Sequence, residues 1–358
     1  MKAENSSNRI VISSRVRLAR NLRGSAFPGW AKKADRQQVL DLLQPAVEAT
    51  SEMKELSISK SMDGLSALEK QLLVERHLVS REHAAKNVGS GVVINKSESV
   101  SVMINEEDHL RMQAIRPGLQ LPKAHQIIDK LDSELEGKVE YAFSPRLGYL
   151  TACPTNVGTG MRASAMLHLP GLVLHEQVNQ IIQAVNKLGL AVRGLHGEGT
   201  EALGNVFQVS NQSTLGERET NVVERLNKVI CQIIEHEENA RLSLLDKKPH
   251  MIYDQVGRAY GILTSAHAMS SKESMNLLSM MRMGVDLDIL PGLDRALIDD
   301  LFIATQPAHL QKTATEKLSA EERDVLRAEI VRTALKGIQR PKEHRPRRDS
   351  SKEGKSNE

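Results

Sequence analysis

Hydrophobic and polar residues alternate along several short segments before residue 212, as they do in strands with one buried face. This alternation predicts strands at residues 9–22, 91–95, 100–105, 148–153, 162–169, 190–193 and 204–210. The segments 91–95 and 100–105 flank the polar residues Lys-Ser-Glu-Ser, a pattern that is typical of a β-hairpin. We therefore expect a sheet in this part of the chain.

Hydrophobic residues three and four positions apart predict helices between these strands and through the rest of the chain. The predicted helices are residues 34–53, 66–79, 121–135, 174–188, 217–245, 274–283 and 320–335. Several strands follow one another directly and helices flank them, which favours an α+β fold with a largely antiparallel sheet. Because strand-like alternation almost disappears after residue 212, we expect an all-α domain to follow the sheet.

The 358 residues are enough for two domains, and the change from mixed to helical patterns sets the boundary between them. We predict a first domain at residues 1–240 and a helical second domain at residues 241–340. The remaining segment, 341–358, is polar and charged, so it cannot bury a hydrophobic face and is predicted to be disordered.

Composition and charge argue against several classes of protein. The formal net charge of +3 is small for this length and gives no indication of direct nucleic-acid binding. The two cysteines cannot form a disulfide framework, the N-terminal residues do not resemble a secretory signal, and no hydrophobic run is long enough to span a membrane. We expect a cytoplasmic protein in a reducing compartment.

The segment 153–162, Cys-Pro-Thr-Asn-Val-Gly-Thr-Gly-Met-Arg, combines groups suited to a ligand-binding loop. Its glycines allow the backbone to approach a ligand closely, and Arg162 can bind a phosphate. Cys153 can act as a nucleophile or contact a ligand, and a neighbouring arginine favours its thiolate. A small buried residue, or an oxidation-sensitive thiol without a catalytic role, is the alternative explanation for Cys153.

Arginines recur at strand ends and loops, whereas the common nucleotide-binding and metal-binding motifs do not occur in the sequence. These arginines are Arg15, Arg17, Arg111, Arg162 and Arg193. Guanidinium groups bind phosphate oxygens bidentately and keep their charge. If they converge, they suit a nucleoside triphosphate and a transferring phosphoryl group. A solvent-exposed edge strand explains Arg15 and Arg17 equally well, and a surface ion pair explains Glu107 with Arg111.

Four sequence motifs occur in the order that is seen in phosphagen (guanidino) kinases. They are Arg15-Val-Arg17, Asn105-Glu-Glu-Asp-His-Leu-Arg111, Cys153-Pro-Thr-Asn-Val-Gly-Thr159 followed by Arg162, and Val192-Arg-Gly-Leu-His-Gly-Glu198. Over residues 9–215 the chain therefore resembles this superfamily. The chain begins close to the first arginine motif, has a helical C-terminal extension and contains Arg323-Asp-Val-Leu-Arg-Ala328. In these features it resembles the bacterial protein arginine kinases.

This resemblance implies roles for individual residues. Glu107 and Glu198 would hold the substrate guanidinium, and Cys153 would contact the same group. The arginines that would clamp the phosphates of ATP are Arg15, Arg17, Arg111, Arg162 and Arg193. The residues that would bind phosphoarginine are Arg323, Asp324 and Arg327. Mg²⁺ would be held by the phosphates and water, without metal ligands from the protein.

The reference pKa values of a glutamate, about 4.3, and of a guanidinium, about 12.5 to 13.8, limit what Glu107 can do. Because the gap is so wide, an ordinary glutamate cannot deprotonate the guanidinium before attack. We expect Glu107 and Glu198 to orient the guanidinium and to take its proton as the N–P bond forms.

The resemblance implies an ATP-dependent kinase that phosphorylates arginine side chains in proteins and so marks them for regulation or degradation. It also implies a homodimer whose partners include an activator protein, a stress-gene repressor and a Clp-type protease chaperone. Two alternatives are a kinase for free arginine or another small guanidine, and an adaptor that binds phosphoarginine. The N-terminal helical domain that encloses free guanidines in arginine and creatine kinases is missing here, which counts against the first alternative. The complete set of catalytic motifs counts against the second.

Overall fold

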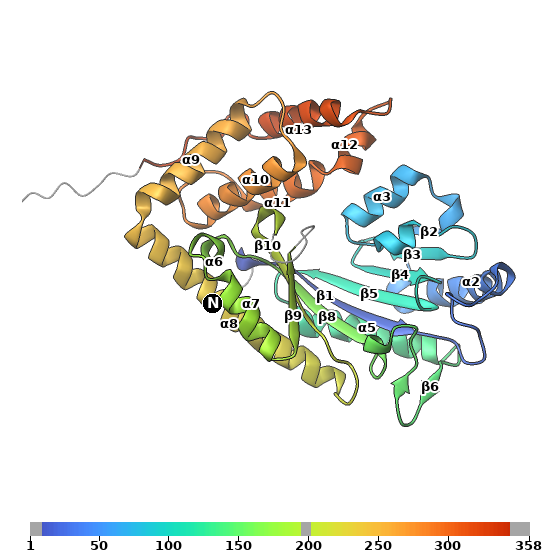
Figure 1. Ribbon diagram of the computed structural model, residues 1–358. Coiled ribbons are helices and arrows are strands. Elements are labelled where there is room, and N and C mark those ends of the chain that lie inside the picture. Colours follow the sequence, from blue (N-terminus) through green and yellow to red (C-terminus); the bar gives the residue numbers. More distant parts are fainter. Residues whose placement is uncertain (1–8, 195–201, 344–358) are drawn as a thin grey trace, which may run out of the picture.

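The computed structural model describes residues 9–194 and 202–343. Its centre is an eight-stranded sheet with the strand order β2-β3-β4-β5-β1-β8-β10-β9, in which all neighbouring strands are antiparallel (Figure 1). The strands are β1 (Val11–Arg20), β2 (Leu56–Ser61), β3 (Gly91–Asn95), β4 (Val100–Ile104), β5 (Leu110–Pro117), β8 (Met161–His168), β9 (Leu190–Gly194) and β10 (Val206–Asn211). The predicted α+β class with an antiparallel sheet is confirmed.

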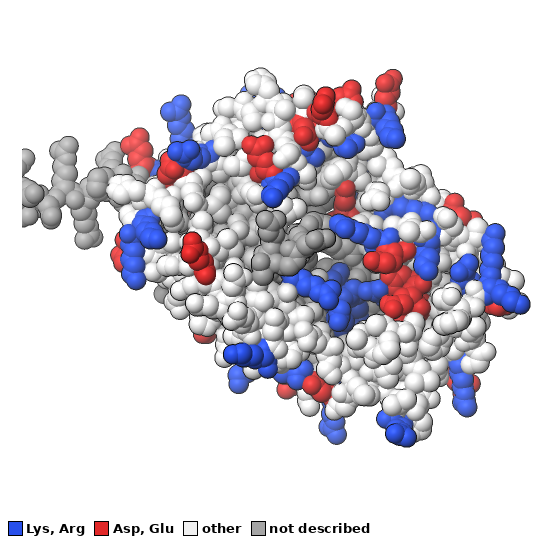
Figure 2. All heavy atoms as spheres, viewed as in Figure 1, with Lys and Arg blue, Asp and Glu red and all other residues white. Residues whose placement is uncertain are grey.

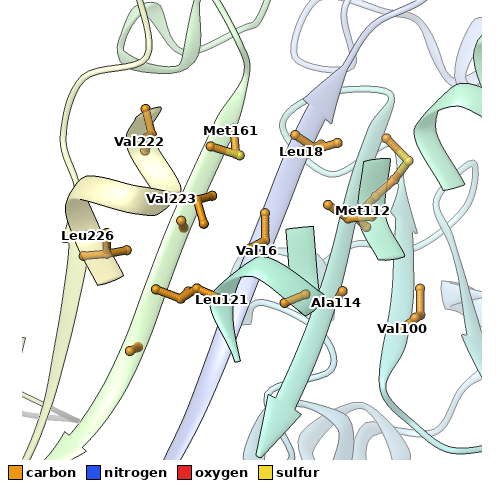
Figure 3. Packing of buried hydrophobic residues seen from close by; sticks show 14 of the residues in the cluster. Val16, Leu18, Val100, Met112, Ala114, Leu121, Met161, Val222, Val223 and Leu226 are labelled. Atoms are coloured by element: carbon orange, nitrogen blue, oxygen red, sulfur yellow. The ribbon is translucent and has the colours of Figure 1, made fainter. Parts of the chain in front are cut away.

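Three helices cover one face of this sheet: α2 (Lys33–Glu48), α5 (Leu121–Glu136) and α8 (Glu219–Lys247). Alternate residues of β1, β5 and β8 supply the hydrophobic side of the contact, because successive side chains of a strand point to opposite faces. Figure 3 shows part of this core, which includes Val16, Leu18, Met112, Ala114, Met161, Leu121, Val222, Val223 and Leu226. The other residues of the same strands therefore lie on the second face.

The second face is covered only in part by helices of the first half of the chain. Strands β3 and β4 are buried on both faces, because α3 (Ala67–Glu75) and α4 (Arg81–Ala84) lie over their second side. Helix α3 begins at a capping box in which Ser66 accepts from the Glu69 amide and Glu69 accepts from the Ser66 amide. Strands β5, β1, β8, β10 and β9 extend beyond this cover.

The C-terminal part of the described chain is entirely helical and has a hydrophobic core of its own. Its helices are α9 (Pro249–Ser265), α10 (Ser271–Asp286), α11 (Arg295–Ala304), α12 (Pro307–Thr313) and α13 (Ala320–Ala334). The predicted all-α C-terminal region is confirmed. In residues 9–194 and 202–343, no helix has the length and hydrophobicity needed to cross a membrane.

A buried polar cluster fixes these helices to the sheet. His168 lies at the end of β8, and its Nε2 forms a hydrogen bond of 2.8 Å with Ser279 Oγ. Its Nδ1 is 3.1 Å from Arg282 Nη1. Arg241 on α8 donates to the His168 carbonyl at 3.1 Å. Burial and the two arginines hold the pKa of His168 well below its ordinary value, so this imidazole is a neutral hydrogen-bonding group.

The structure differs from the sequence predictions in several elements. Strands β2 and β5 were not predicted. Strand β2 is an edge strand with largely exposed side chains, so it lacks a clear hydrophobic alternation. In β5, the carboxylates that precede the strand concealed the alternation of Leu110, Met112 and Ala114. The helix predicted at 174–188 begins later, as α7 (Val178–Lys187). The unpredicted helix α6 (Pro170–Leu174) precedes it, and Glu176, with a φ of 59°, lies between the two. The strand predicted at 148–153 is only β7 (Gly148–Tyr149), which pairs with β6 (Phe143–Ser144). The predictions for residues 1–8 and 344–358 lie outside the described residues.

Candidate functional site

A row of arginines crosses the second face of the sheet, and the strand register sets their positions. Arg17 on β1 lies directly opposite Arg162 on β8. On the other side of β1, Ala19 lies opposite Arg111 of β5, which places Arg111 on the same face as Arg17 and Arg15. Arg193 on β9 lies opposite Gln208 on β10, and Gln208 lies opposite Met166 on β8, so Arg193 is on the same face. The structure thus brings together all five arginines singled out in the sequence.

This row is electrostatically unfavourable without a counter-ion. Burial and the charges of Arg111 and Arg162 lower the pKa of Arg15 to about 10. Burial and the charges of Arg15, Arg111 and Arg162 hold the pKa of Arg17 well below its ordinary value. The Arg15 Nη2 donates to the Gln208 side-chain oxygen at 2.9 Å, and the buried Nε of Arg17 has no hydrogen-bond partner among the residues that the structure describes. Like charges directly opposite each other destabilise a sheet. An anion bound across the row would remove this penalty.

Arg111 is the arginine that is held by a carboxylate. Its Nη1 lies 2.6 Å from each oxygen of Glu106, whose side chain is only 2% exposed. The Ser80 hydroxyl donates to the same carboxylate at 2.6 Å. Burial alone would raise the pKa of Glu106, but the ion pair and hydrogen bonds outweigh it and lower that pKa. Arg111 lies in strand β5 and its ion-pair partner is Glu106, not the Glu107 of the surface ion pair that the sequence left open.

The loop at residues 105–109, between β4 and β5, is fixed by its other side chains. Asn105 has a φ of 58°, and its amide donates to two backbone carbonyls at 2.7 and 2.8 Å. Asp108 accepts from Asn21 at 2.6 Å and from the Ala152 amide at 2.7 Å. His109 Nδ1 accepts from the Leu22 amide, two residues after β1, at 3.0 Å. These contacts leave Glu107 as the exposed side chain of the loop.

Glu107 faces a cleft on the second face of the sheet. The residues that line this cleft are Phe27, Gly29, Trp30, Glu82, Lys86, Glu106, Glu107, Arg111, Thr151 and Ala152. Among the described residues, none hydrogen-bonds to the Glu107 carboxylate. Partial burial and the nearby charges of Asp108 and Glu106 raise the pKa of Glu107 above its ordinary value. Figure 2 shows a group of acidic side chains next to a group of basic side chains in the hollow of the molecule. Such a cleft suits a cationic ligand.

Cys153 lies at the edge of the same region, at the start of the 3₁₀ turn Pro154–Asn156. Its side chain is half-buried, and its Sγ is 3.0 Å from Thr155 Oγ1. Burial lowers the pKa of Arg162, whereas a negative charge on Cys153 would raise it, because the thiol lies near that arginine. Gly158 holds the loop against residues 214–215, because a Cβ there would lie 2.4 Å from the Thr214 carbonyl oxygen. The Asp108 contact with Ala152 ties this loop to the loop of Glu107.

A largely apolar cavity of about 230 Å³ adjoins the other end of the arginine row. Its lining includes Ile12, Ser13, Arg15, Glu75, Arg76, His77, Ile115, Ser164, Met166, Val206, Met275, Asp299, Phe302, Ile303 and Gln306. Arg15 belongs both to this cavity and to the arginine row, whereas Arg111 belongs both to the row and to the cleft of Glu107. The site therefore has three parts in a continuous order: apolar cavity, arginine row and acidic cleft.

Comparisons with known proteins identify the family of this chain. Residues 38–240 match the family ATP:guanido phosphotransferase, C-terminal catalytic domain, and residues 249–346 match the family Protein-arginine kinase McsB C-terminal domain. The protein-arginine kinase of Halothermothrix orenii is 45% identical to this chain over 327 residues, which are 91% of this chain and 93% of that relative. The protein-arginine kinase of Syntrophomonas wolfei is 46% identical over 329 residues, 91% of each chain. This chain belongs to the protein-arginine kinase family.

Solved structures of other guanidino kinases share the fold. The substrate-free duplicated taurocyamine kinase from Schistosoma mansoni superimposes with a TM-score of 0.59 and 26% identity, covering 77% of this chain and 40% of that one. Lombricine kinase gives a TM-score of 0.57 and 26% identity, covering 64% of this chain and 67% of that one. This chain thus shares the guanidino-kinase fold, as the sequence motifs predicted.

The three residues predicted to bind phosphoarginine lie on or beside one helix, α13, away from the arginine row. Arg327 is buried, and its guanidinium donates to the carbonyls of Thr305 and Met269 at 2.9 and 2.8 Å and to Asp324 at 2.5 Å. Arg323 is half-buried and donates to the Leu318 carbonyl at 2.8 Å. Arg327 is thus occupied by contacts within the protein, whereas Arg323 and Asp324 retain exposed surface. Glu198, the second predicted catalytic carboxylate, lies outside the described residues.

Sequence reasoning missed the residues that support the site. Glu106 and Asp108 flank Glu107 in the run Glu-Glu-Asp, and nothing in that run distinguishes the exposed carboxylate from the two buried ones. Ser80 and Gln208 come from distant segments and carry no recognisable motif. Within the described ranges, one group could offer three metal ligands: His125, Asp129 and Glu219. It lies between α5 and α8, on the opposite face of the sheet from the arginine row.

Proposed function

We propose that the protein transfers the γ-phosphoryl group of ATP to the guanidinium group of arginine side chains in proteins. The observation that carries this proposal is the continuous order of cavity, arginine row and acidic cleft. An elongated ligand with an apolar end and a polyanionic end fits the first two parts, and a guanidinium fits the third. Membership of the protein-arginine kinase family supports the same assignment.

The nucleotide would lie with its base in the apolar cavity and its phosphates along the arginines. Arg15 would hold the end of the triphosphate near the base, and Arg17 and Arg162 would hold its middle. The fit rests on the half-buried, mutually repelling guanidinium groups, which need an anionic partner. Arginine cannot ligate a metal ion, so Mg²⁺ bound to the nucleotide would be held by phosphate oxygens and water.

The acceptor guanidinium would lie in the acidic cleft beside Arg111. Glu107 would hold it in line with the γ-phosphate, with Glu198 and Cys153 as further contacts. In the transfer step the acceptor nitrogen forms the N–P bond, the bond between the γ-phosphorus and the bridging oxygen of ADP breaks, and the acceptor proton passes to Glu107. Arg111, fixed by Glu106, would stabilise the charge on the transferring group.

The helical C-terminal part would recognise phosphoarginine through Arg323 and Asp324. Phosphoarginine offers a phosphate for a cation and a remaining positive group for a carboxylate, so an arginine beside an aspartate is complementary to it. Arg327 would support this pair by positioning Asp324, with which it forms an ion pair. A homodimer and the activator, repressor and chaperone partners implied by the family resemblance remain part of this proposal.

Phosphate transfer from labelled ATP to a protein substrate tests the assignment. We expect label that is lost in acid and retained in base, because a phosphoramidate is acid-labile, and we expect mild mass spectrometry to place it on arginine. Free arginine at the same concentration should accept much less label. Acid-stable label on hydroxyl residues would contradict the proposed reaction, and faster labelling of free arginine would contradict the proposed substrate class.

A further inference from the structure

The cavity beside Arg15 has walls from two distant parts of the chain. One wall is made by the sheet and α3, through residues such as Ser13, Ile115 and Met166. The opposite wall comes from the C-terminal helices: Met275 on α10, Phe302 and Ile303 on α11, and Gln306 just before α12. The cavity is therefore incomplete without the helical C-terminal part.

Contacts between α3 and α12 hold the two walls together. The Glu75 carboxylate accepts from the backbone amides of Ala308 and His309 at 2.7 and 3.1 Å, and from His309 Nδ1 at 2.7 Å. The Arg76 Nε donates to His309 Nε2 at 3.4 Å, and its Nη1 bonds to Glu98 at 2.7 Å. One imidazole tautomer, with the proton on Nδ1, satisfies both contacts of His309. We call these contacts of Glu75, Arg76 and His309 the α3–α12 clasp.

The clasp and the cavity share residues. Glu75 and Arg76 line the cavity as well as binding α12, and Gln306 lies at the residue before that helix. The Gln306 side chain is itself fixed, because its Nε2 donates to the Phe302 carbonyl at 2.8 Å and to Met275 Sδ at 3.3 Å. A ligand that fills the cavity therefore touches Glu75 and Arg76 of the clasp on one wall and Gln306, next to α12, on the other.

We propose that α10, α11 and the α3–α12 clasp form the outer wall of the nucleotide-base site, so that the C-terminal helices are positioning elements for ATP. This inference rests on the proposed function, since it presumes that the base occupies the cavity. Linkage makes the effect reciprocal: a base that binds both walls favours docking of the C-terminal helices on α3. The phosphates lie outside this wall, so only the base contributes to the coupling.

The test compares ADP with inorganic tripolyphosphate, which carries the phosphates without a base. Binding of both to the full-length protein is measured by calorimetry for the wild type, Ile303→Ala, His309→Ala and the exposed α12 control Lys312→Ala. We expect Ile303→Ala to weaken ADP binding about tenfold, because the loss of an apolar contact of this size changes affinity by that order. His309→Ala should weaken ADP binding by up to about the same factor, because it removes the side-chain contacts to Glu75 and Arg76 that hold the outer wall in place. Tripolyphosphate affinity should stay within about twofold in every variant, and Lys312→Ala should match the wild type for both ligands.

A second measurement covers the case in which a variant changes the fold. Hydrogen exchange of the wild type should show ADP protecting the amides of α3 and α12, whereas tripolyphosphate protects only the strands of the arginine row. Equal ADP affinity in all variants, or equal protection of α12 by both ligands, would overturn the inference. If the proposed nucleotide site itself were wrong, neither ligand would bind to the wild type, and the two failures are therefore distinguishable.

Discussion

Arg111 and Glu106 form an ion pair in which one guanidinium nitrogen lies 2.6 Å from both carboxylate oxygens. Arg15, by contrast, meets the neutral amide of Gln208. Arg111 is thus held in place before any ligand arrives, at the point where the arginine row meets the acidic cleft. A fixed cation at this position suits the group in transfer, because a preorganised charge does not have to reorient during the reaction.

Glu106→Gln tests this support. The substitution keeps the shape of the side chain but removes the buried charge that opposes Arg111, so we expect a loss of about 1.5 to 3 kcal/mol in the free energy of unfolding. Activity should fall further than ADP affinity, because Arg111 would serve the transferring phosphoryl group more than the bound nucleotide. Chemical denaturation, calorimetry and initial rates measure the three quantities. A variant with wild-type stability would show that the pair does not hold the loop.

Glu107→Gln should lower kcat by about two to four orders of magnitude, the range expected when a proton acceptor is removed. Glu107 is exposed and has like charges beside it, so the free energy of unfolding should not decrease. ADP binding should remain close to that of the wild type. The matched control is Glu224→Gln, an exposed carboxylate on α8 behind the sheet. Unchanged turnover in Glu107→Gln would remove Glu107 from the mechanism.

The pH dependence of kcat/KM should report the raised pKa of Glu107. Partial burial and the charges of Asp108 and Glu106 disfavour the ionised form, so the pKa lies above the ordinary value of 4.5. Because only the ionised carboxylate can take a proton, activity is lost as the pH falls through this raised pKa. Glu82→Gln removes a further negative charge and should move the acidic limb to lower pH. A shift in the opposite direction would contradict the assignment.

Arg17→Met should make the ligand-free protein more stable while it damages nucleotide binding. Arg17 is half-buried opposite Arg162, and its removal relieves both desolvation and repulsion. We expect a gain of about 1 kcal/mol, or roughly 2–4 °C in Tm for a domain of this size. The increase of Tm on adding ADP should shrink or disappear. Arg146→Met, on the exposed 144–147 turn, is the control and should change neither value.

Arg323→Ala is the appropriate test of phosphoarginine recognition on α13. The guanidinium of Arg327 donates to two backbone carbonyls, so Arg327→Ala should destabilise the C-terminal helices by about 2 kcal/mol or more. In that variant, a loss of binding could not be distinguished from a loss of folding. Arg323→Ala removes one contact to Leu318 and should leave Tm nearly unchanged. Titration with a phosphoarginine peptide should then show weaker binding. Wild-type affinity in this variant would place the recognition site elsewhere.

The sequence predicted the class of the fold and most of its central strands, because those strands carry a clear alternation. Strand β1 shows why: Val16 and Leu18 must face the core, so Arg15 and Arg17 must face the site. The alternation cannot reveal which strands pair. The meeting of Arg17 with Arg162 depends on a contact between segments about 145 residues apart, and no local pattern encodes that register.

The supporting residues could not be predicted for a related reason. In the run from Glu106 to Asp108, all three carboxylates look equally exposed in the sequence, and only the positions of Ser80, Arg111 and Asn21 in space decide which are buried. The cavity shared by α3 and α11 has the same origin, since helices that are distant in the chain meet there. The motif resemblance indicated arginines that the structure brings together on one face of the sheet, but it could not assign the partner of each.

The five arginines all stand on strands of one sheet, whereas Glu107 and Cys153 stand on connections between elements. Loops accept substitution and changes of length more readily than the paired strands of a sheet. Evolution can therefore change which acceptor such an enzyme binds by remodelling a few connections, while the strands that carry the arginines stay unchanged. Grafting the 105–109 and 151–159 connections together, since Asp108 joins them, offers a route to redesign the acceptor on the same sheet.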